Sequence, residues 1–380
     1  MSRGSAAHLL FVPGGGRTGL GETIRTLVLA QAARERWPAA RVGFLTDEEH
    51  VRLPSDDFER HTVTGRVSRN VAAVNRLLGE LAPDLVVFDG RGQGAQIACA
   101  SRAGARTVYL AGVPTMRRRA FRWSRLRSLD QIWIRRDIVD PRGDLTLGER
   151  LRLRLAARPR AHFVQAISPL PDAGRLKELR SRLGLGADSY LLFAPGGGGY
   201  EREGRPVPEI FAEAAGRVHE ATGLACVVVL GPLYDGPTSG VADVIAVPAL
   251  SPHEMIDLVS GAQLVACGGG GLMGQALATG RVCVAAPAGG SDQPGRIARC
   301  EEAGLLAASP LAADAIAERA LALLADDERR AGIGQRIEQS GLRNGLPHAL
   351  SLMEGLLAAR RPIGELADAQ RGGAERSSPS

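Results

Sequence analysis

Short apolar runs alternate with amphipathic stretches along the first half of the chain. The apolar runs end in glycine, proline or aspartate and predict strands at 8–13, 41–46, 85–90 and 107–112. The stretches between them carry apolar residues every three or four positions and predict helices at 23–36, 70–81 and 93–103. Strands that alternate with helices form parallel sheets covered on both faces, so the pattern predicts an α/β fold.

The same pattern begins again near residue 190. Each half opens with an apolar run that leads into proline and glycines, "FVPGGG" in the first and "FAPGGGG" in the second. We therefore expect two Rossmann-like domains that face one another across a cleft. The expected boundaries are a first domain at 1–167, a linker at 168–189, a second domain at 190–345, a C-terminal helix at 346–362 that returns to the first domain, and a disordered tail at 366–380.

Composition narrows the class of protein. Hydrophobic residues make up 44% and charged residues 23% of the 380 positions, which is typical of a soluble globular protein. No run of 18 apolar residues predicts a membrane span, and the apolar run near the N-terminus is better explained as a buried strand than as a signal peptide. The five cysteines lack metal-binding spacing, so we expect buried reduced thiols, no metal and a cytoplasmic location.

Positive charge is concentrated in one segment. Between Arg117 and Arg160 there are fourteen arginines and five acidic residues. Within it, Arg117–Arg136 also contains Phe121, Trp123 and Trp133, which predicts either a grip on an anionic acceptor or contact with the inner face of an anionic membrane. A solvated helical face is the alternative. Nucleic-acid binding is not expected, although an arginine-rich stretch keeps it as a rival function.

Glycine-rich segments follow the predicted strands in both halves. In open parallel α/β sheets, ligands bind beyond the carboxyl ends of the strands. Glycine lets backbone N–H groups approach an anion, and the next helix N-terminus adds positive potential. The segment "CGGGGLMGQALATG", 267–280, has this order of strand, glycines and helix, and it predicts a diphosphate site.

Residues 268–305 resemble the donor-binding segment of GT-B glycosyltransferases, in the branches that act on lipid-linked and natural-product acceptors. The resemblance implies a nucleoside-diphosphate sugar as donor, UDP- or dTDP-linked, with no separate cofactor. It implies that the backbone amides of Gly270, Gly271, Leu272 and Met273 hold the phosphate, and that the side chains of Asp292 and Gln293 face the sugar. It also implies that the loop at Gly197 and Gly198 lies beside the diphosphate, and that His253 lies near the nucleobase.

One position departs from that family pattern. Many members have a glutamate at the position of Gln275, where it accepts hydrogen bonds from the ribose hydroxyls. A neutral amide binds a hydroxyl more weakly than a charged acceptor. Gln275 is therefore either a weaker ribose ligand or an ordinary helix residue.

The segment "GLGETIRTLVLA", 19–30, resembles a motif of nucleotide-sugar hydrolases of the pseudaminic acid pathway, which share the GT-B fold. Gly19, Gly21 and Arg25 match, while Glu22 stands where those relatives have a histidine in the cleft. Glu22 is either the catalytic base or an acid that stabilises the helix start. Asp89, at the end of a predicted strand, orients Glu22, binds the acceptor or caps the next helix.

These features together favour a glycosyltransferase. We expect inverting, metal-independent transfer to a small-molecule acceptor that is anionic or lipid-linked, in secondary-metabolite or cell-envelope biosynthesis. Hydrolysis of a nucleotide sugar, with water as the acceptor, is the first alternative. A non-catalytic partner protein that keeps the fold is the second.

Overall fold

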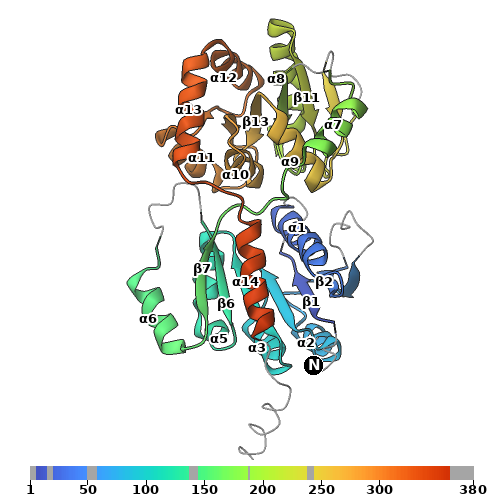
Figure 1. The fold of residues 1–380 in the computed structure, drawn as a ribbon, viewed down its shortest axis with the longest axis vertical. Coiled ribbons are helices and arrows are strands. Elements are labelled where there is room, and N and C mark those ends of the chain that lie inside the picture. The colour runs from blue at the N-terminus through green and yellow to red at the C-terminus, as the bar shows by residue number, and fades with distance from the viewer. Residues whose placement is uncertain are drawn as a thin grey trace, which may run out of the picture.

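The structure is a computed structural model that describes residues 6–14, 20–48, 58–136, 144–186, 189–237 and 244–359. Gly19 and the tail predicted at 366–380 lie outside these ranges. Figure 1 shows two units stacked along the long axis of the molecule, each with a sheet between helices. Among the described helices, none is both long enough and apolar enough to cross a bilayer.

The first unit contains a seven-stranded parallel sheet in the order β3-β2-β1-β4-β5-β6-β7. The chain order reverses between β1 and β4, which makes their carboxyl ends the topological switch point of this sheet. The strands are β1 His8–Val12, β2 Arg41–Asp47, β3 Glu59–Val63, β4 Leu85–Asp89, β5 Arg106–Ala111, β6 Gln131–Arg135 and β7 Arg160–Val164.

The second unit repeats this winding with six parallel strands in the order β12-β11-β8-β13-β14-β15. Its switch point lies between β8 and β13. The predicted fold class, two Rossmann-like domains, is therefore confirmed. The strands are β8 Tyr190–Ala194, β11 Ala225–Val229, β12 Ile245–Val247, β13 Leu264–Gly268, β14 Cys283–Ala286 and β15 Ala307–Ala308; β9 Glu201–Arg202 and β10 Arg205–Pro206 form a small antiparallel pair.

The helices cover both faces of the two sheets (Figure 1). In the first unit they are α1 Gly21–Arg36, α2 Val71–Leu81, α3 Gly94–Arg102, α4 Pro114–Ala120, α5 Trp123–Leu126 and α6 Leu147–Ala156. In the rest of the chain they are α7 Ala173–Arg182, α8 Val207–Thr222, α9 Pro252–Gly261, α10 Gly271–Ala278, α11 Gln293–Glu302, α12 Ala313–Ala325, α13 Asp327–Gln339 and α14 Leu346–Ala358.

Two helices show how the chain crosses between the units. Helix α7 lies within the segment expected to be a linker, and its Leu179 belongs to the core of the second unit. Helix α14 follows the second unit but packs on the first, where Leu346, Ala349 and Met353 join the core that contains Trp133. The chain thus passes between the units twice, once before α7 and once before α14.

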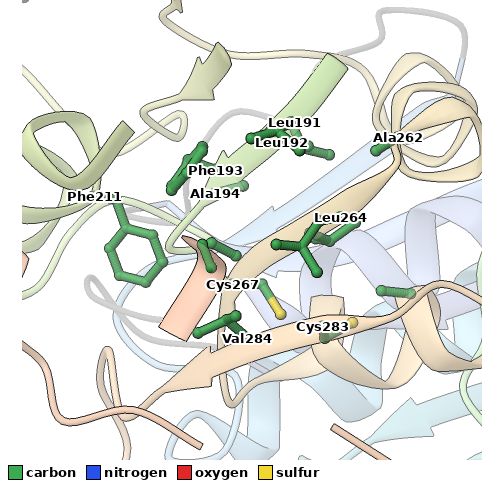
Figure 2. Packing of buried hydrophobic residues seen from close by; sticks show 14 of the residues in the cluster. Leu191, Leu192, Phe193, Ala194, Phe211, Ala262, Leu264, Cys267, Cys283 and Val284 are labelled. Carbon is green, nitrogen blue, oxygen red and sulfur yellow. The ribbon is translucent and has the colours of Figure 1, made fainter. Parts of the chain in front are cut away.

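Apolar strands supply most of the core. In the second unit, residues from β8, β13 and β14 pack against α8 (Figure 2), with Phe193, Phe211 and Leu264 almost fully buried. Cys267 and Cys283 lie in this core. All five cysteines are free thiols and four of them are buried, while Cys99 is half-buried, so the expectation of reduced thiols is confirmed.

The structure shows three features that the sequence pattern did not predict. Strand β3 was not predicted, because "ERHTV" has four polar residues before its only apolar one and lies at the edge of the sheet. Phe121 and Trp133 are core residues, and of the three aromatic residues in Arg117–Arg136 only Trp123 is exposed. Asp47, the last residue of β2, is buried, paired with Arg91 and bonded to the amide of Val67.

Candidate active site

The first side of the candidate site is the switch point of the first sheet, where β1 and β4 end. A β-carbon on Gly14 would lie 2.5 Å from the carbonyl oxygen of Asp89 and 3.2 Å from Cγ of Glu22. Glycine at position 14 therefore lets the end of β1 pack against β4 while Glu22 lies over it. Glu22 is half-buried and is the second residue of α1, whose N-cap residue Leu20 makes no side-chain capping bond.

A buried ion pair lies directly beneath Glu22. Arg25 Nε donates to Asp89 Oδ2 at 2.9 Å, and Arg25 Nη2 donates to Asp89 Oδ1 at 2.6 Å. Asp89 is completely buried. A β-carbon on Gly112, after β5, would lie 3.0 Å from Arg25 Nη2, so the ends of the adjacent strands β4 and β5 both meet this guanidinium. The structure thus places Glu22, Arg25 and Asp89 in one cluster.

Burial changes the pKa of Asp89 more than the ion pair with Arg25 does. Loss of hydration raises the pKa of this carboxyl to about 6, although the Arg25 guanidinium acts in the opposite direction. The charge of Glu22 also raises the pKa of Asp89, while Arg135 at the end of β6 lowers it. A strongly perturbed carboxyl group at a switch point is typical of functional sites.

The second side is built from the loops that follow β8 and β13. Gly198 has φ +84°, and a β-carbon there would lie 2.6 Å from the carbonyl oxygen of Leu230. The neighbouring Gly197 has only Leu233 near its β-position, at 3.9 Å, and its carbonyl accepts from the amide of Leu233 at 2.9 Å. The loop after β8 is therefore pressed backbone to backbone against the loop after β11.

Helix α10 starts immediately after β13 and leaves its first turn open. No atom lies within 4 Å of the β-position of Gly271, and the β-position of Gly270 meets only Gln293 Nε2, at 3.7 Å. Of the other predicted residues here, Leu272 is half-buried and Met273 fully buried, so the predicted contact with a phosphate would come from their backbone amides rather than from their side chains. An open helix start with free N–H groups is a ready anion site.

Two polar residues at the start of α11 border this helix start. Gln293 Oε1 accepts from the amide of Gly289 at 3.2 Å, which leaves its Nε2 directed toward Gly270. The carboxylate of Asp292 pairs with Arg296, and Arg296 Nη1 donates to the carbonyl of Gly269 at 2.8 Å. Asp292 keeps a side chain that is 43% exposed, so one oxygen remains available to a ligand.

The sequence did not single out Arg296 or Tyr200. Arg296 is buried and connects α11 to the glycine loop through its bond to the carbonyl of Gly269. Its position four residues after Asp292, one helical turn away, could have predicted their ion pair from the sequence. The ring of Tyr200 lies over Gly289, so close that no β-carbon would fit there. Both residues hold the loops around the predicted donor site in place.

Two predicted residues lie where the units meet. His253 on α9 is affected by Arg175 and by Glu35 of α1; burial lowers its pKa, as does Arg175, while Glu35 and Asp257 raise it. Gln275 Nε2 donates to the carbonyl of Ile167 at 3.2 Å, in the segment that leaves the first unit. Gln275 thus ties α10 to that segment, and its predicted contact with a ribose remains a prediction.

A large cavity lies at another point between the units. It has a volume of about 1000 Å³ and is lined by the ends of β6, β7, α10 and α13, including Arg136, Phe163, Leu277, Arg343 and His348. It meets α10 at the C-terminal end of that helix. The eight residues of α10 span roughly 12 Å, so this cavity is separate from the open helix start at Gly270 and Gly271.

The chain is similar in structure to known glycosyltransferases, although no family model and no curated protein sequence matches it. One neighbour is Phytolacca americana UGT2 in complex with UDP-2-fluoro-glucose and pterostilbene, with TM-score 0.60, 14% identity, and coverage of 93% of this chain and 100% of that chain. Another is CalG4, the calicheamicin glycosyltransferase, with TM-score 0.55, 18% identity, and coverage of 94% and 100%.

The name of a third neighbour indicates a different kind of reaction. It is named as a UDP-N-acetylglucosamine 2-epimerase from Listeria monocytogenes, with TM-score 0.55, 16% identity, and coverage of 94% of this chain and 98% of that chain. At these identities the likeness establishes the fold. The chain has the GT-B fold, as the resemblance implied, with two Rossmann-like units.

Adjacent glycines of the β8 loop offer a matched test of the loop geometry. We expect Gly198→Ala to lower the free energy of unfolding by about 1–3 kcal/mol, because the new methyl group meets the Leu230 carbonyl and φ is positive. Gly197→Ala has room for the methyl group, so its effect should stay within about 0.5 kcal/mol. Urea unfolding of both variants measures the difference, and equal losses would contradict the loop packing.

The raised pKa of Asp89 predicts a pH dependence of stability with a definite sign. A carboxyl group whose pKa is about 6 in the folded chain and 3.8 when unfolded contributes less stability as pH rises between these values, since the unfolded chain ionises first. From pH 4.5 to 7, the wild type should lose about 2 kcal/mol relative to Asp89→Asn. Urea unfolding at both pH values measures this change. A relative gain by the wild type would mean that Arg25 dominates over burial.

Proposed function

We propose that this protein is a glycosyltransferase that moves a sugar from a nucleoside-diphosphate sugar to a small-molecule acceptor. The observation that carries the proposal is the pair of switch points. One presents the cluster of Glu22, Arg25 and Asp89, and the other presents the open helix start at Gly270 and Gly271. In open α/β sheets, ligands bind at such points.

The second unit would hold the donor. Backbone amides at the start of α10 match the charge of a diphosphate, and the loop at Gly197 and Gly198 lies on the neighbouring strand end. Gln293 Nε2 and the exposed oxygen of Asp292 would bind sugar hydroxyls. Several neighbours carry UDP or a UDP-sugar in their names, which favours a UDP-linked donor; a dTDP-linked donor remains the second choice.

Glu22 would act as the general base of an inverting, metal-independent transfer. The base removes the proton of the acceptor hydroxyl as its oxygen attacks the anomeric carbon from the face opposite the diphosphate. The helix dipole and the amides at Gly270 and Gly271 would stabilise the charge that develops on the leaving diphosphate. Asp89 would hold Arg25 in place beneath Glu22. Because the charges of Arg25 and Asp89 nearly cancel, Glu22 would lie beside an ion pair with little net charge.

Hydrolysis is the second candidate, and the residues around Glu22 favour it. Gly21, Glu22 and Arg25 occupy the positions at which nucleotide-sugar hydrolases of the same fold have their motif. In that case Glu22 would activate water in place of an acceptor hydroxyl. The two reactions share the donor and the base, so they differ only in whether an acceptor enters the cleft.

The acceptor would approach from the first unit, next to an exposed basic and apolar surface. Leu147, Leu151 and Leu155 form one stripe on α6 with exposures of 82%, 57% and 64%. The same face exposes Arg150, Arg152 and Arg154, and helices α4 and α5 beside it expose Arg118, Arg119, Arg122, Trp123 and Arg127. We propose that this surface, Leu147 to Leu155 with the neighbouring arginines, rests on an anionic membrane and gives access to a lipid-linked acceptor.

Natural-product acceptors are the competing class. Structural neighbours include the calicheamicin glycosyltransferase and a spinosyn forosaminyltransferase, whose names refer to natural products. Acceptors from both secondary-metabolite and cell-envelope biosynthesis should therefore be tested.

Replacing the proposed base tests the function directly. We expect Glu22→Gln to lower kcat by about 10²–10⁴-fold with little change in the KM for donor, because the amide cannot take the acceptor proton. The assay follows nucleotide release and glycosylated product by mass spectrometry, with UDP- and dTDP-sugars and a panel of phenols, macrolide aglycones and polyprenyl phosphates. The matched control is Glu80→Gln, an exposed acid on α2 that should keep full activity.

Each outcome of that assay has a separate meaning. Release of nucleotide without any acceptor, at the same rate with or without the panel, favours hydrolysis. A Glu22→Gln variant as active as the wild type rules out Glu22 as base. If UDP raises the melting temperature of the wild type but no sugar turns over, the chain is a non-catalytic partner.

Membrane contact is tested with the stripe on α6. The double variant Leu151→Glu/Leu155→Glu should bind phosphatidylglycerol vesicles at least about tenfold more weakly in co-sedimentation, because burying one leucine is worth about 1.5–3 kcal/mol. Leu170→Glu is the control, since Leu170 is 58% exposed but lies outside this surface. Wild-type protein that stays in the supernatant at low salt would contradict the contact.

A further inference from the structure

Three metal-binding side chains meet at the opposite end of the first sheet from the candidate active site. They are His8 on β1 and Glu59 and His61 on β3. His8 Nε2 lies 3.8 Å and His61 Nε2 lies 3.7 Å from Glu59 Oε2, and all three atoms lie within 4.8 Å of one another. The two strands are not neighbours, because β2 runs between them.

Gly43 on β2 makes this meeting possible. In the sheet register, Gly43 lies beside Glu59, and Arg41, two residues earlier on the same face, lies beside His8. A β-carbon on Gly43 would lie 3.2 Å from Cβ of Glu59 and 3.5 Å from His61 Nε2. Any side chain here would fill the space above β2 into which the two histidines and the glutamate project. A glycine inside a strand often marks such a close approach.

The histidine nitrogens that face this space have no hydrogen-bond partner among the residues that the structure describes. Nε2 of His8 and Nε2 of His61 are both buried and unpaired, and His8 is 4% exposed. Nδ1 of His8 lies 3.1 Å from the carbonyl oxygen of Leu81. A carbonyl only accepts, so Nδ1 carries the proton and Nε2 keeps its lone pair. Metal-binding histidines are commonly fixed in this way through the nitrogen that does not bind the metal.

We propose that His8, Glu59 and His61 bind one divalent transition-metal ion, Zn²⁺ in the first instance. Two imidazoles and one carboxylate are a known zinc ligand set, with water in the fourth position. Zinc–ligand bonds of about 2.0–2.2 Å in tetrahedral geometry place ligand atoms roughly 3.4 Å apart. The two distances to Glu59 therefore need to close by only a few tenths of an ångström, while the two histidine nitrogens, which lie within 4.8 Å of one another, can need a larger adjustment of their side chains. Glu59 and His61 are 36% and 20% exposed, which leaves a path from solvent.

Arg41 is the competitor for this site. Its guanidinium holds both oxygens of Glu59, at 2.8 and 2.9 Å, from a side chain that is 54% exposed. An exposed ion pair of this kind contributes little to stability, so the guanidinium can move into solvent when a cation arrives. The bound ion would link the edge strand β3 to the central strand β1 across β2. It would act as a structural clamp, far from the residues proposed for sugar transfer.

The experiment uses the full chain without an affinity tag, freed of metal by a chelator and titrated with Zn²⁺ against a chromophoric chelator. We expect one Zn²⁺ per chain, and a melting temperature that rises with Zn²⁺ concentration. Co²⁺ in the same site should give a visible absorption band that Zn²⁺ displaces.

Variants separate this site from other metal-binding groups. His61→Ala and Glu59→Gln should weaken Zn²⁺ binding by about 100-fold or more, since even outer-shell changes cost 10–100-fold. Arg41→Gln should tighten binding. His348→Ala removes an exposed histidine elsewhere and should bind like the wild type. The proposal is overturned by a wild type without saturable micromolar binding, or by a His61→Ala variant that binds and is stabilised equally well.

Discussion

The relative position of the two units depends on a pair of hydrogen-bonded crossings. The segment at 165–169 leaves the first unit, and the segment at 343–345 returns to it. Asn344 joins them: its Nδ2 donates to the carbonyl oxygens of Ser168 and Pro169 at 2.7 and 3.1 Å, and its Oδ1 accepts from the amide of Ser168 at 3.3 Å. Gly345 allows this contact, because a side chain there would collide with the carbonyl of Gln165. Both crossings are therefore held side by side, and the way the two units are joined depends on these contacts.

In the buried pair of Arg25 and Asp89, the loss of hydration opposes the attraction between the two charges. The carboxylate loses more free energy through burial than it recovers from the guanidinium, which is why its pKa rises to about 6. A chain selected for stability alone would be better with an apolar pair of the same volume. Retaining the two charges therefore makes sense as positioning: Asp89, at the end of β4, holds the guanidinium of Arg25 beneath Glu22 and cancels its charge.

Much of the fold could be predicted from the sequence because parallel strands are continuous apolar runs. The strands that end in Val12 and Asp89 were recognisable for this reason. Strand β3 was not, since it lies at an edge and begins with four polar residues. The cluster of His8 with Glu59 and His61 was also hidden, because it is assembled across β2 by a glycine and has no spacing in the sequence. The contact of Gln275 with Ile167 depends on how the units meet, which local pattern does not encode.

The fold itself cannot choose the reaction, since proteins named as glycosyltransferases and as an epimerase share it at similar TM-scores. Several neighbours carry UDP or a UDP-sugar in their names, and the open start of α10 is where the proposed diphosphate would bind in this chain. The first unit supplies what is particular to this chain, because it places Glu22, Arg25 and Asp89 together at its switch point. A carboxylate is a weaker base in water than the imidazole of a histidine. Glu22 is half-buried, above the ion pair of Arg25 with Asp89. Under the proposed function Glu22 would take a proton either from an acceptor hydroxyl or from water, so the choice between transfer and hydrolysis depends on which of the two reaches its carboxylate.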